Sequence, residues 1–441
     1  MEESLSNKLS AQEIVELSLN YTFFSWSVQS AVNPIPMVKA QGVYFWDANG
    51  KRYLDFSSQL MNLNIGHQHP KVIKAIQDQA GVLAYAHPSM ATEPRGLAGK
   101  KISEVAPGDL NKTFFCLGGA EANENAIKFS RFFTGRHKIL SRYRSYHGAT
   151  YGAIALTGDY RRLAVEPAMP GSVHFLDPYC YRCPFGWTRE TCHRECINHV
   201  EEIIQYEGPD NIAAIIMEGV TGSNGLIVPP DDYWPRIRAI CDRFGILLIS
   251  DEVMSGWGRT GKWFAVDNWN VVPDIITTAK GITAGYVPLG AVIVSDKIAR
   301  FFDDKMLWAG LTYSAHPLSC AAAVATIEVY EEDGLIENAV TLGKYLGKRL
   351  EEIKMGHPSV GDVRYIGLFS ALELVKNHAK KEPIDPLTDI QKVLREKGLF
   401  TFNFHNILFV VPPLCINETQ LEEGLKIIEN ALEQVTDKLV H

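Results

Sequence analysis

A single lysine, Lys280, follows a β-branched apolar run in the segment DIITTAKGITAGYVPLGA. A lysine that is held away from water loses its proton more readily and can then attack a carbonyl carbon. For one lysine considered by itself, a solvated side chain at the end of a strand is the more frequent case. Lys280 therefore indicates chemistry only if other reactive groups accompany it.

Asp251 is the first such group, because it closes the apolar run GILLISD one predicted strand before Lys280. Adjacent parallel strands would bring both side chains to one edge of a sheet, where ligands of open α/β sheets bind. An acid at this position can bind Mg²⁺, cap the next turn, or pair with a protonated ring nitrogen. The sequence contains no G-x-x-x-x-G-K-[ST] nucleotide loop, which weakens the magnesium alternative.

The segment FFCLGGAEANENA supplies a candidate anion site. Its predicted strand ends at Cys116 or Leu117, and Gly118, Gly119 and Ala120 lead directly into a helix. Small residues expose backbone N–H groups there, and a helix N-terminus favours a phosphate. An ordinary strand–helix turn accounts for the same residues equally well.

Together, the three strand ends match the three functional groups of pyridoxal 5′-phosphate. The phosphate fits the Gly-Gly turn, the ring nitrogen fits Asp251, and the aldehyde fits a Schiff base with Lys280. Asp251 would keep the ring nitrogen protonated, and Lys280 would shuttle a proton once the substrate amine displaces it. Tyr146 and His147, in YRSYHGAT, follow another predicted strand, where an aromatic ring could stack on the cofactor.

The hydrophobic pattern predicts an α/β fold. Between about residues 70 and 325, amphipathic helical patterns alternate with short apolar runs, and this predicts a central, mainly parallel sheet covered on both faces. The strands are expected at KTFFCL, AAIIMEGV, GILLISDEV, DIITTA and GAVIVS. We therefore expect a large cofactor-binding domain at residues 71–325.

A smaller α+β domain is predicted at residues 326–441. Its strands are expected in VGDVRYIGLFSALEL and LFTFNFHNILFVVP, with helices at about 386–397 and 418–437. Residues 1–70 are expected to join this domain through a helix that starts at the capping-box pattern SAQE, and through the hairpin VYFWDANGKRYLDF.

Charge and hydropathy exclude several classes of partner. The net charge of −8 and the pI near 5.9 argue against binding to nucleic acid or to an anionic membrane. The first residues, MEESLSNKLSAQE, lack the pattern of a signal peptide, and no uninterrupted apolar stretch reaches the ~18 residues of a spanning helix. We therefore expect a cytoplasmic protein.

Four of the eight cysteines cluster in CYRCPFGWTRETCHREC. They are Cys180, Cys183, Cys192 and Cys196. Their thiolates could bind zinc, with help from His193 or His199. Reduced thiols in a surface loop are the simpler interpretation, because the second pair lacks the usual zinc-ribbon spacing, so no metal is predicted.

With these motifs in place, the sequence resembles the class III pyridoxal-phosphate aminotransferases, of the aspartate aminotransferase fold (fold type I). GGAEANENA, YHG, SDEV, GRTG, AKGITAGYVPLGA and LTYSAHP occur in the order and spacing of that family, over nearly the whole chain. The residues that match its cofactor contacts are Lys280, Asp251, Tyr146, Val253, Gly118, Gly119, Ala120 and Thr312.

The resemblance implies a role for each matching residue. Lys280 is the Schiff-base lysine and Asp251 the ring-nitrogen partner, while Tyr146 and Val253 cover the two ring faces. The Gly-Gly-Ala turn forms the phosphate cup, and Thr312 reaches the phosphate in a neighbouring subunit. A homodimer or a dimer of dimers is therefore expected. Glu218 matches a family acid on the strand before Asp251.

The departures from the family concern the substrate. Relatives that act on ornithine or gamma-aminobutyrate carry charged groups at positions that are here Ala149, Ser223 and Phe409. A carboxylate in a dry pocket needs a charged partner, so this chain must supply one elsewhere. The candidates from sequence are Arg144, Arg162 and Arg259.

The altered pocket resembles that of the omega-amino-acid branch, and the chain as a whole is most similar to the taurine aminotransferases. The expected reaction is a ping-pong transfer from taurine, beta-alanine or hypotaurine to pyruvate or 2-oxoglutarate. A lyase or an aminomutase/epimerase on the same scaffold is the alternative, and a non-catalytic cofactor-binding regulator is a third, weaker one. The family lines this pocket with residues that match Ser25, Trp26, Met61, Asn403, His405 and Asn406, although core packing explains Trp26 and Met61 equally well.

Overall fold

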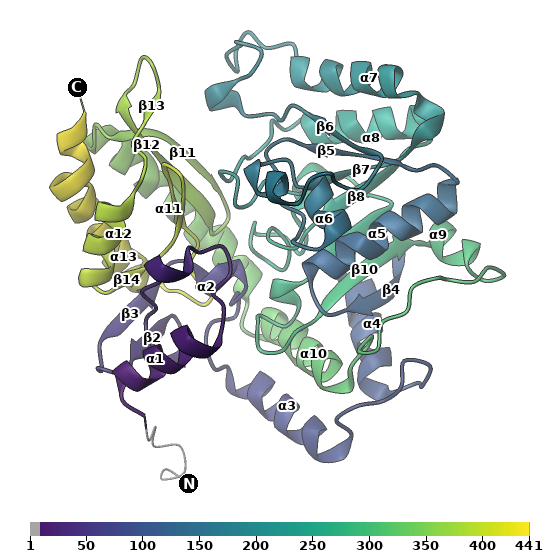
Figure 1. Ribbon diagram of the computed structural model, residues 1–441, viewed down its shortest axis with the longest axis horizontal. Coiled ribbons are helices and arrows are strands. Elements are labelled where there is room, and N and C mark those ends of the chain that lie inside the picture. The colour runs from purple at the N-terminus through teal and green to yellow at the C-terminus, as the bar shows by residue number, and fades with distance from the viewer. Residues whose placement is uncertain (1–8, 441) are drawn as a thin grey trace.

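The computed structural model describes residues 9–440 (Figure 1). Residues 1–8 lie outside the described residues. They begin the N-terminal segment in which no signal peptide is predicted. Within residues 9–440, no helix is both long enough and apolar enough to cross a lipid bilayer.

The largest sheet has seven strands in the order β4-β10-β9-β8-β7-β5-β6. Strands β5 to β9 run parallel to one another, whereas β10 is antiparallel to its neighbours β4 and β9. The strands are β4 (Leu110–Cys116), β5 (Lys138–Arg142), β6 (Ser172–Phe175), β7 (Ile212–Glu218), β8 (Leu247–Asp251), β9 (Ile275–Thr278) and β10 (Gly290–Ser295). The predicted α/β fold with a mainly parallel central sheet is confirmed.

Helices cover both faces of this sheet, with α7 and α8 on one side and α5 and α6 on the other (Figure 1). Every residue of β7, β8 and β10 is buried, which explains the continuous apolar runs. The helices that surround the sheet are α3 (Pro70–Val82), α4 (Glu93–Val105), α5 (Gly119–Thr134), α6 (Tyr151–Leu156), α7 (Glu195–Glu207), α8 (Tyr233–Phe244), α9 (Asp296–Phe301) and α10 (Pro317–Glu332).

The sequence pattern did not single out β5 and β6. β5 has the sequence KILSR, with a charged residue at each end, and β6 is only four residues long and contains His174. Such short strands lack the continuous apolar run by which the other strands were predicted.

Residues near the two ends of the chain share a second sheet. The predicted hairpin is formed by β2 (Tyr44–Asp47) and β3 (Arg52–Asp55), with β1 (Met37–Gln41) beside β2. β14 (Leu399–Phe400) adds to the other edge by pairing in parallel with β3. The short helix α2 (Ser58–Met61) follows the hairpin.

The predicted first helix is α1 (Ala11–Tyr21), and its capping box is present. The Ser10 hydroxyl accepts a hydrogen bond from the Glu13 N–H at 3.2 Å, and Glu13 Oε2 accepts one from the Ser10 N–H at 2.7 Å. These two bonds satisfy backbone donors that the first turn of a helix leaves free.

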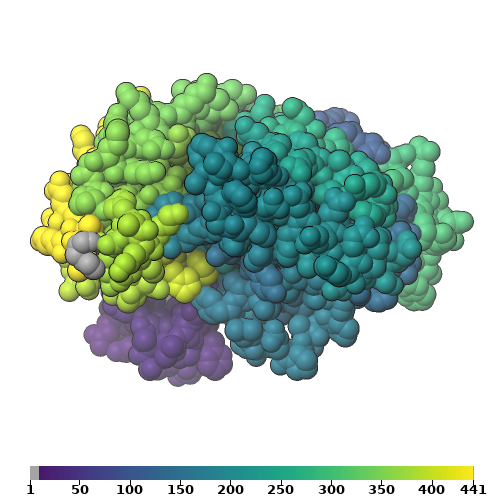
Figure 2. All heavy atoms as spheres, turned by 90° about the horizontal axis from the view of Figure 1, so that it is seen from above, coloured from purple at the N-terminus to yellow at the C-terminus, as the bar shows by residue number. Residues whose placement is uncertain are grey.

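A third sheet lies near the C-terminus, in the order β11-β12-β16-β15, with β13 paired to β12. In the space-filling view, the purple N-terminal and yellow-green C-terminal residues lie together at one end of the molecule (Figure 2). The elements are α11 (Leu335–Gly356), β11 (Val360–Ile366), β12 (Phe369–Asn377), β13 (Glu382–Pro383), α12 (Thr388–Glu396), β15 (Asn403–Phe404), β16 (Ile407–Val410) and α13 (Glu418–Ala431).

Candidate active site

Three parallel strands bring the predicted site residues to one edge of the large sheet. Glu218 at the end of β7 is in register with Asp251 at the end of β8, and Asp251 is in register with Thr277 on β9. Lys280 follows β9 and begins a 3₁₀ turn, Lys280–Ile282. The strands that precede Asp251 and Lys280 are thus adjacent and parallel, as the sequence predicted.

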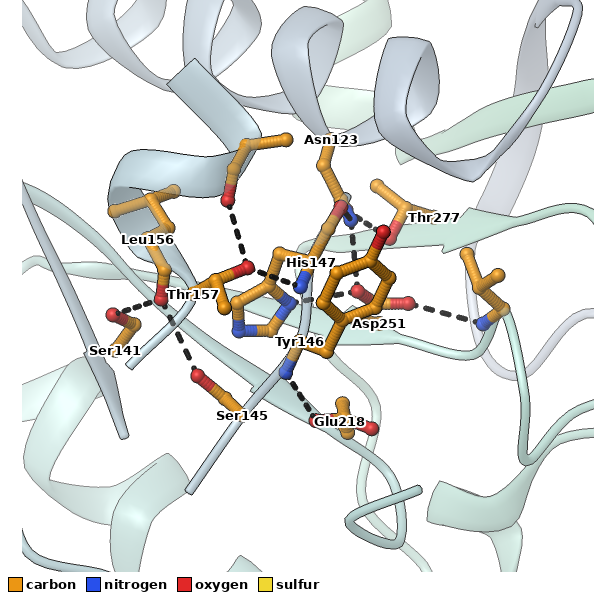
Figure 3. A network of polar contacts seen from close by, with 12 residues as sticks. Asn123, Ser141, Ser145, Tyr146, His147, Leu156, Thr157, Glu218, Asp251 and Thr277 are labelled. Carbon is orange, nitrogen blue, oxygen red and sulfur yellow. Dashed lines mark hydrogen bonds and ion pairs between the residues drawn. The ribbon is translucent and has the colours of Figure 1, made fainter. Parts of the chain in front are cut away.

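Asp251 is held by three hydrogen bonds, two of which involve side chains (Figure 3). Its Oδ2 lies 2.7 Å from Nδ1 of His147 and accepts a bond of 2.8 Å from Nδ2 of Asn123. Its Oδ1 accepts the backbone N–H of Val253 at 3.0 Å. These contacts fix the orientation of a carboxylate that is 2% exposed.

Asn123 was not identified from the sequence, although it lies within the motif GGAEANENA. Its amide also donates to the backbone carbonyl of His147 at 2.6 Å and accepts from the Thr277 hydroxyl at 2.7 Å. Asn123 therefore joins helix α5, the segment of His147 and strands β8 and β9 (Figure 3). The sequence feature that could have identified Asn123 is its position, one helical turn after the Gly-Gly segment at which the helix begins.

Burial lowers the pKa of Lys280 to about 8, against an ordinary value of 10.5. Asp251 and Glu218 oppose this shift, whereas Arg161 and Arg259 add to it. A neutral amine is the nucleophilic form of lysine, so this environment increases the reactive fraction. Within residues 9–440, Nζ of Lys280 has no hydrogen-bond partner.

The backbone of Lys280 is also unusual, because its φ is +47°. A residue with a side chain rarely adopts this left-handed conformation, which costs on the order of 1 kcal/mol and is frequent at functional sites. After β9, the chain therefore changes direction at the turn Lys280–Ile282, where the candidate site lies.

The Gly-Gly-Ala turn has the geometry of an anion cup. Gly118 is the N-cap of α5, and a Cβ at this position would have no other atom within 4 Å. A Cβ on Gly119 would instead approach Val253 Cγ1 to 2.8 Å, so Gly119 allows close packing of the cup against Val253. The first N–H groups of a helix lack intrahelical acceptors, so the N-terminus of α5 can bind an anion.

Tyr146 and Arg161 pack against each other close to Glu218. The Tyr146 N–H donates to Glu218 Oε1 at 3.0 Å, and its ring lies edge-on to Trp26, with centroids 6.1 Å apart. Cζ of Arg161 lies 4.2 Å from the centroid of the Tyr146 ring. Arg161 also donates to Ser223 Oγ at 3.0 Å and pairs with Asp159. The site thus presents one guanidinium, paired with the Asp159 carboxylate, beside the Tyr146 ring.

The three arginines proposed from sequence make other contacts. Arg144 pairs with Asp177 at 3.1 Å, and Arg162 pairs with Glu166 at 3.2 Å. Arg259 is fully buried and donates to Pro412 O, Leu368 O, Ser58 and Asn64, although its charge still depresses the pKa of Lys280. Arg161, which the sequence did not single out, is the one placed against the Tyr146 ring.

The remaining predicted pocket residues are dispersed. Met61 is 1% exposed and belongs to the apolar core, whereas Trp26 is 61% exposed and lies beside Tyr146. Asn403 and Asn406 donate to backbone carbonyls, and His405 pairs with Asp385 at 3.1 Å. Thr312 is exposed, and its carbonyl accepts a bond from the Tyr85 hydroxyl.

The clustered cysteines are unpaired thiols. Across the part of the chain that the structure describes, no group of three or more His, Cys, Asp or Glu side chains is arranged to hold a metal ion. The zinc alternative for the cysteine segment therefore gains no support from the fold.

The groups at this edge fit pyridoxal phosphate. An open cup at a helix N-terminus can take the phosphate, and an unpartnered lysine amine can take the aldehyde. Nε2 of His147 is buried without a partner among the described residues, and Nδ1 of the same ring contacts the Asp251 carboxylate, which would pair with the ring nitrogen. The fold and these groups together define the class of enzyme as one that uses pyridoxal phosphate.

Comparisons with known proteins identify the family. The profile of the family Aminotransferase class-III matches residues 26–432. The taurine:2-oxoglutarate aminotransferase from Bifidobacterium kashiwanohense, solved with PLP and glutamate, is 43% identical with a TM-score of 0.95, over 98% of this chain and 99% of that one. The chain belongs to the class III aminotransferases, which use pyridoxal phosphate and exchange an amino group between a small amine and a keto acid.

Two further relatives differ in activity. The leucine/methionine racemase of Thermococcus litoralis is 40% identical over 92% of both chains. The taurine–pyruvate aminotransferase of Bilophila wadsworthia is 33% identical over 97% of this chain and 98% of its own. Relatives that are 33–40% identical to this chain thus carry different activities.

Proposed function

We propose that this enzyme transfers the amino group of an omega-amine, with taurine as the first choice, to 2-oxoglutarate or pyruvate. The observation that carries the proposal is Arg161, a cation held against the Tyr146 ring by Asp159 and Ser223. A sulfonate spreads its charge over three oxygens, which suits one guanidinium together with neutral donors such as Ser223 and the indole N–H of Trp26. The taurine aminotransferases among the similar proteins support the same choice.

In this proposal, bound pyridoxal phosphate supplies an aldehyde for the amino group and a ring that accepts electrons when a C–H bond is broken. Lys280 binds the aldehyde and moves the proton between substrate carbon and cofactor. Asp251, oriented by His147 and Asn123, keeps a proton on the ring nitrogen. Tyr146 and Val253 would cover the two faces of the ring, and Gly118, Gly119 and Ala120 would hold the phosphate.

A panel of donors crossed with two acceptors tests the substrate assignment. Taurine, hypotaurine, beta-alanine, gamma-aminobutyrate and putrescine are each combined with pyruvate or 2-oxoglutarate, and the amino acid formed is measured. We expect taurine to give the highest kcat/KM. A preference of about 10-fold or more for a cationic diamine would reject Arg161 as the anchor, because a guanidinium repels that donor.

The racemase relative favours one other function, an epimerase or racemase on the same scaffold. Transamination converts all of the bound cofactor to its amine form when the donor is added alone, and no further turnover follows. Formation of the D-enantiomer from L-leucine or L-methionine, without any keto acid, would favour the racemase instead.

The role of Lys280 has a direct test. Lys280→Ala should remove the absorbance that the bound cofactor gives through its covalent bond to the lysine, and it should lower turnover by at least ~10⁴-fold. Borohydride reduction of the wild type should attach the cofactor to the peptide that contains Lys280. Retained activity in the variant would contradict the assignment.

We also propose that the enzyme is a homodimer. Large apolar side chains are exposed along the N-terminal segment and near Thr312, among them Phe23 at 94%, Val28 at 73% and Trp308 at 70% exposed. Large apolar side chains are unfavourable in water, and a partner subunit would bury them. Light scattering should give about twice the mass of the chain, and a monomer at micromolar concentration would contradict this assembly.

A further inference from the structure

A cavity of about 300 Å³ lies between the C-terminal sheet and two loops of the large sheet. Its wall includes Arg182 from the 3₁₀ turn Cys180–Arg182, Asn224 from the loop after β7, Glu373 on β12, and Phe404 and His405 near β15. The proposed mechanism uses none of these five side chains.

Two hydrogen-bond donors on this wall have no acceptor. Asn224 is only 4% exposed, and its Nδ2 has no partner within residues 9–440. Nη2 of Arg182 is likewise buried without a partner in that range. An unsatisfied buried donor costs about 1–3 kcal/mol, so an acceptor that enters the cavity stabilises this arrangement.

The acceptors of the wall are already engaged. Glu373 is fully buried and receives the Tyr179 hydroxyl, Nε of Arg182 and Nη1 of Arg364. Asp385 pairs with His405 at 3.1 Å. A ligand that enters the cavity is one source of a further acceptor. A carboxylate group, which accepts from a guanidinium and an amide with its two oxygens, matches the two free donors.

The cavity is close to the proposed active site. Asn224 directly follows Ser223, which accepts a hydrogen bond from Arg161 at 3.0 Å. Phe404 lines the cavity, and its ring centroid lies 5.4 Å from Cζ of Arg161. Arg161 thus contacts both the Phe404 ring, which lines the cavity, and the Tyr146 ring.

We propose that this cavity is a second anion site, which binds a carboxylate group through Asn224 and Arg182. The carboxylate has two sources, either the far end of a dicarboxylic substrate held at Lys280 or a separate small carboxylate anion. The first source rests on the proposed transamination, with 2-oxoglutarate as the dicarboxylic acceptor, whereas the second is independent of it.

Binding of unreactive acids to the holoenzyme tests the proposal. Glutarate carries two carboxylates and butyrate carries only one, and both are titrated by calorimetry while the cofactor absorbance is followed. Asn224→Asp should weaken the binding of glutarate by about 10-fold or more, because a carboxylate replaces the amide that donates to the ligand. Asn224→Leu, which adds no charge, should act in the same direction.

The control is Asn211→Asp, which makes the same change at an exposed residue before the opposite end of β7. If the far carboxylate of a substrate is the source, the Asn224 variants weaken glutarate alone and the cofactor absorbance responds to binding. If a separate anion is the source, they weaken both acids equally and the absorbance is unchanged. If the Asn224 variants bind both acids as tightly as Asn211→Asp does, the proposal is overturned. The measurement does not depend on whether taurine is a donor.

Discussion

The lysine that makes the proposed chemistry possible should reduce the stability of the protein without its cofactor. Replacing Lys280 by methionine keeps a side chain of similar length and removes the charge. The fall in pKa from 10.5 to about 8 corresponds to about 3 kcal/mol, at about 1.36 kcal/mol per pKa unit. This is an upper bound because Lys280 retains some contact with solvent.

The sign of the pH dependence follows from the depressed pKa. The unfolded chain keeps the lysine proton up to about pH 10.5, whereas the folded chain releases it near pH 8. The destabilisation is therefore complete below pH 8 and disappears as the pH rises from 8 to 10.5. The Lys280→Met variant carries no charge to bury, so its advantage in stability should be largest near pH 7 and should shrink above about pH 8.

Urea denaturation of the cofactor-free proteins at several pH values between about 6.5 and 10 gives the free energies of unfolding. Lys348→Met is the matched control, because the Lys348 side chain is 76% exposed and its charge is not buried. We expect Lys280→Met to exceed the wild type by up to about 3 kcal/mol at pH 7. Equal stability at pH 7, or a pH profile that matches the Lys348 variant, would refute the reasoning.

Three further substitutions test separate parts of the site and fold. Asp251→Asn should still bind cofactor but lose about 100-fold or more in kcat, because an amide does not hold a proton on the ring nitrogen; normal turnover would contradict this. Arg161→Ala should raise the KM for taurine by about 10–100-fold, since a hydrogen bond to a charged group contributes about 1.5–3 kcal/mol, while the cofactor absorbance stays unchanged. Ser10→Ala should remove the capping box of α1 and cost about 1 kcal/mol, seen as faster amide exchange in the first turn only.

The sequence could predict the strands that carry the cofactor groups because their signals are local. A continuous apolar run that ends in Asp251, and another that ends just before Lys280, each report burial on both faces of a sheet. Parallel neighbours then share an edge by the geometry of the sheet, whatever the rest of the chain does. The strands β5 and β6 were missed because they are short and carry polar residues.

The partners of these groups were harder to predict. Asn123 reaches Asp251 and Thr277 from helix α5, across more than a hundred positions in the chain. Its position near the start of α5 is a weak signal, because the neighbouring Asn125 lies in the same turn region and its amide donates to Glu121 O within the helix. The choice between two asparagines depends on which face of the helix meets the sheet.

The sequence by itself determined the class of fold and the three strand ends that match the cofactor, because the spacing of apolar residues and glycines depends only on neighbouring positions. Only the tertiary structure decided which arginine meets the Tyr146 ring and which buried donors remain free. Arg161 and Arg162 are adjacent and chemically equal, yet only Arg161 packs on the Tyr146 ring while Arg162 turns to Glu166. The direction of a side chain from an irregular turn is set by long-range packing, and no periodic pattern in the sequence encodes it.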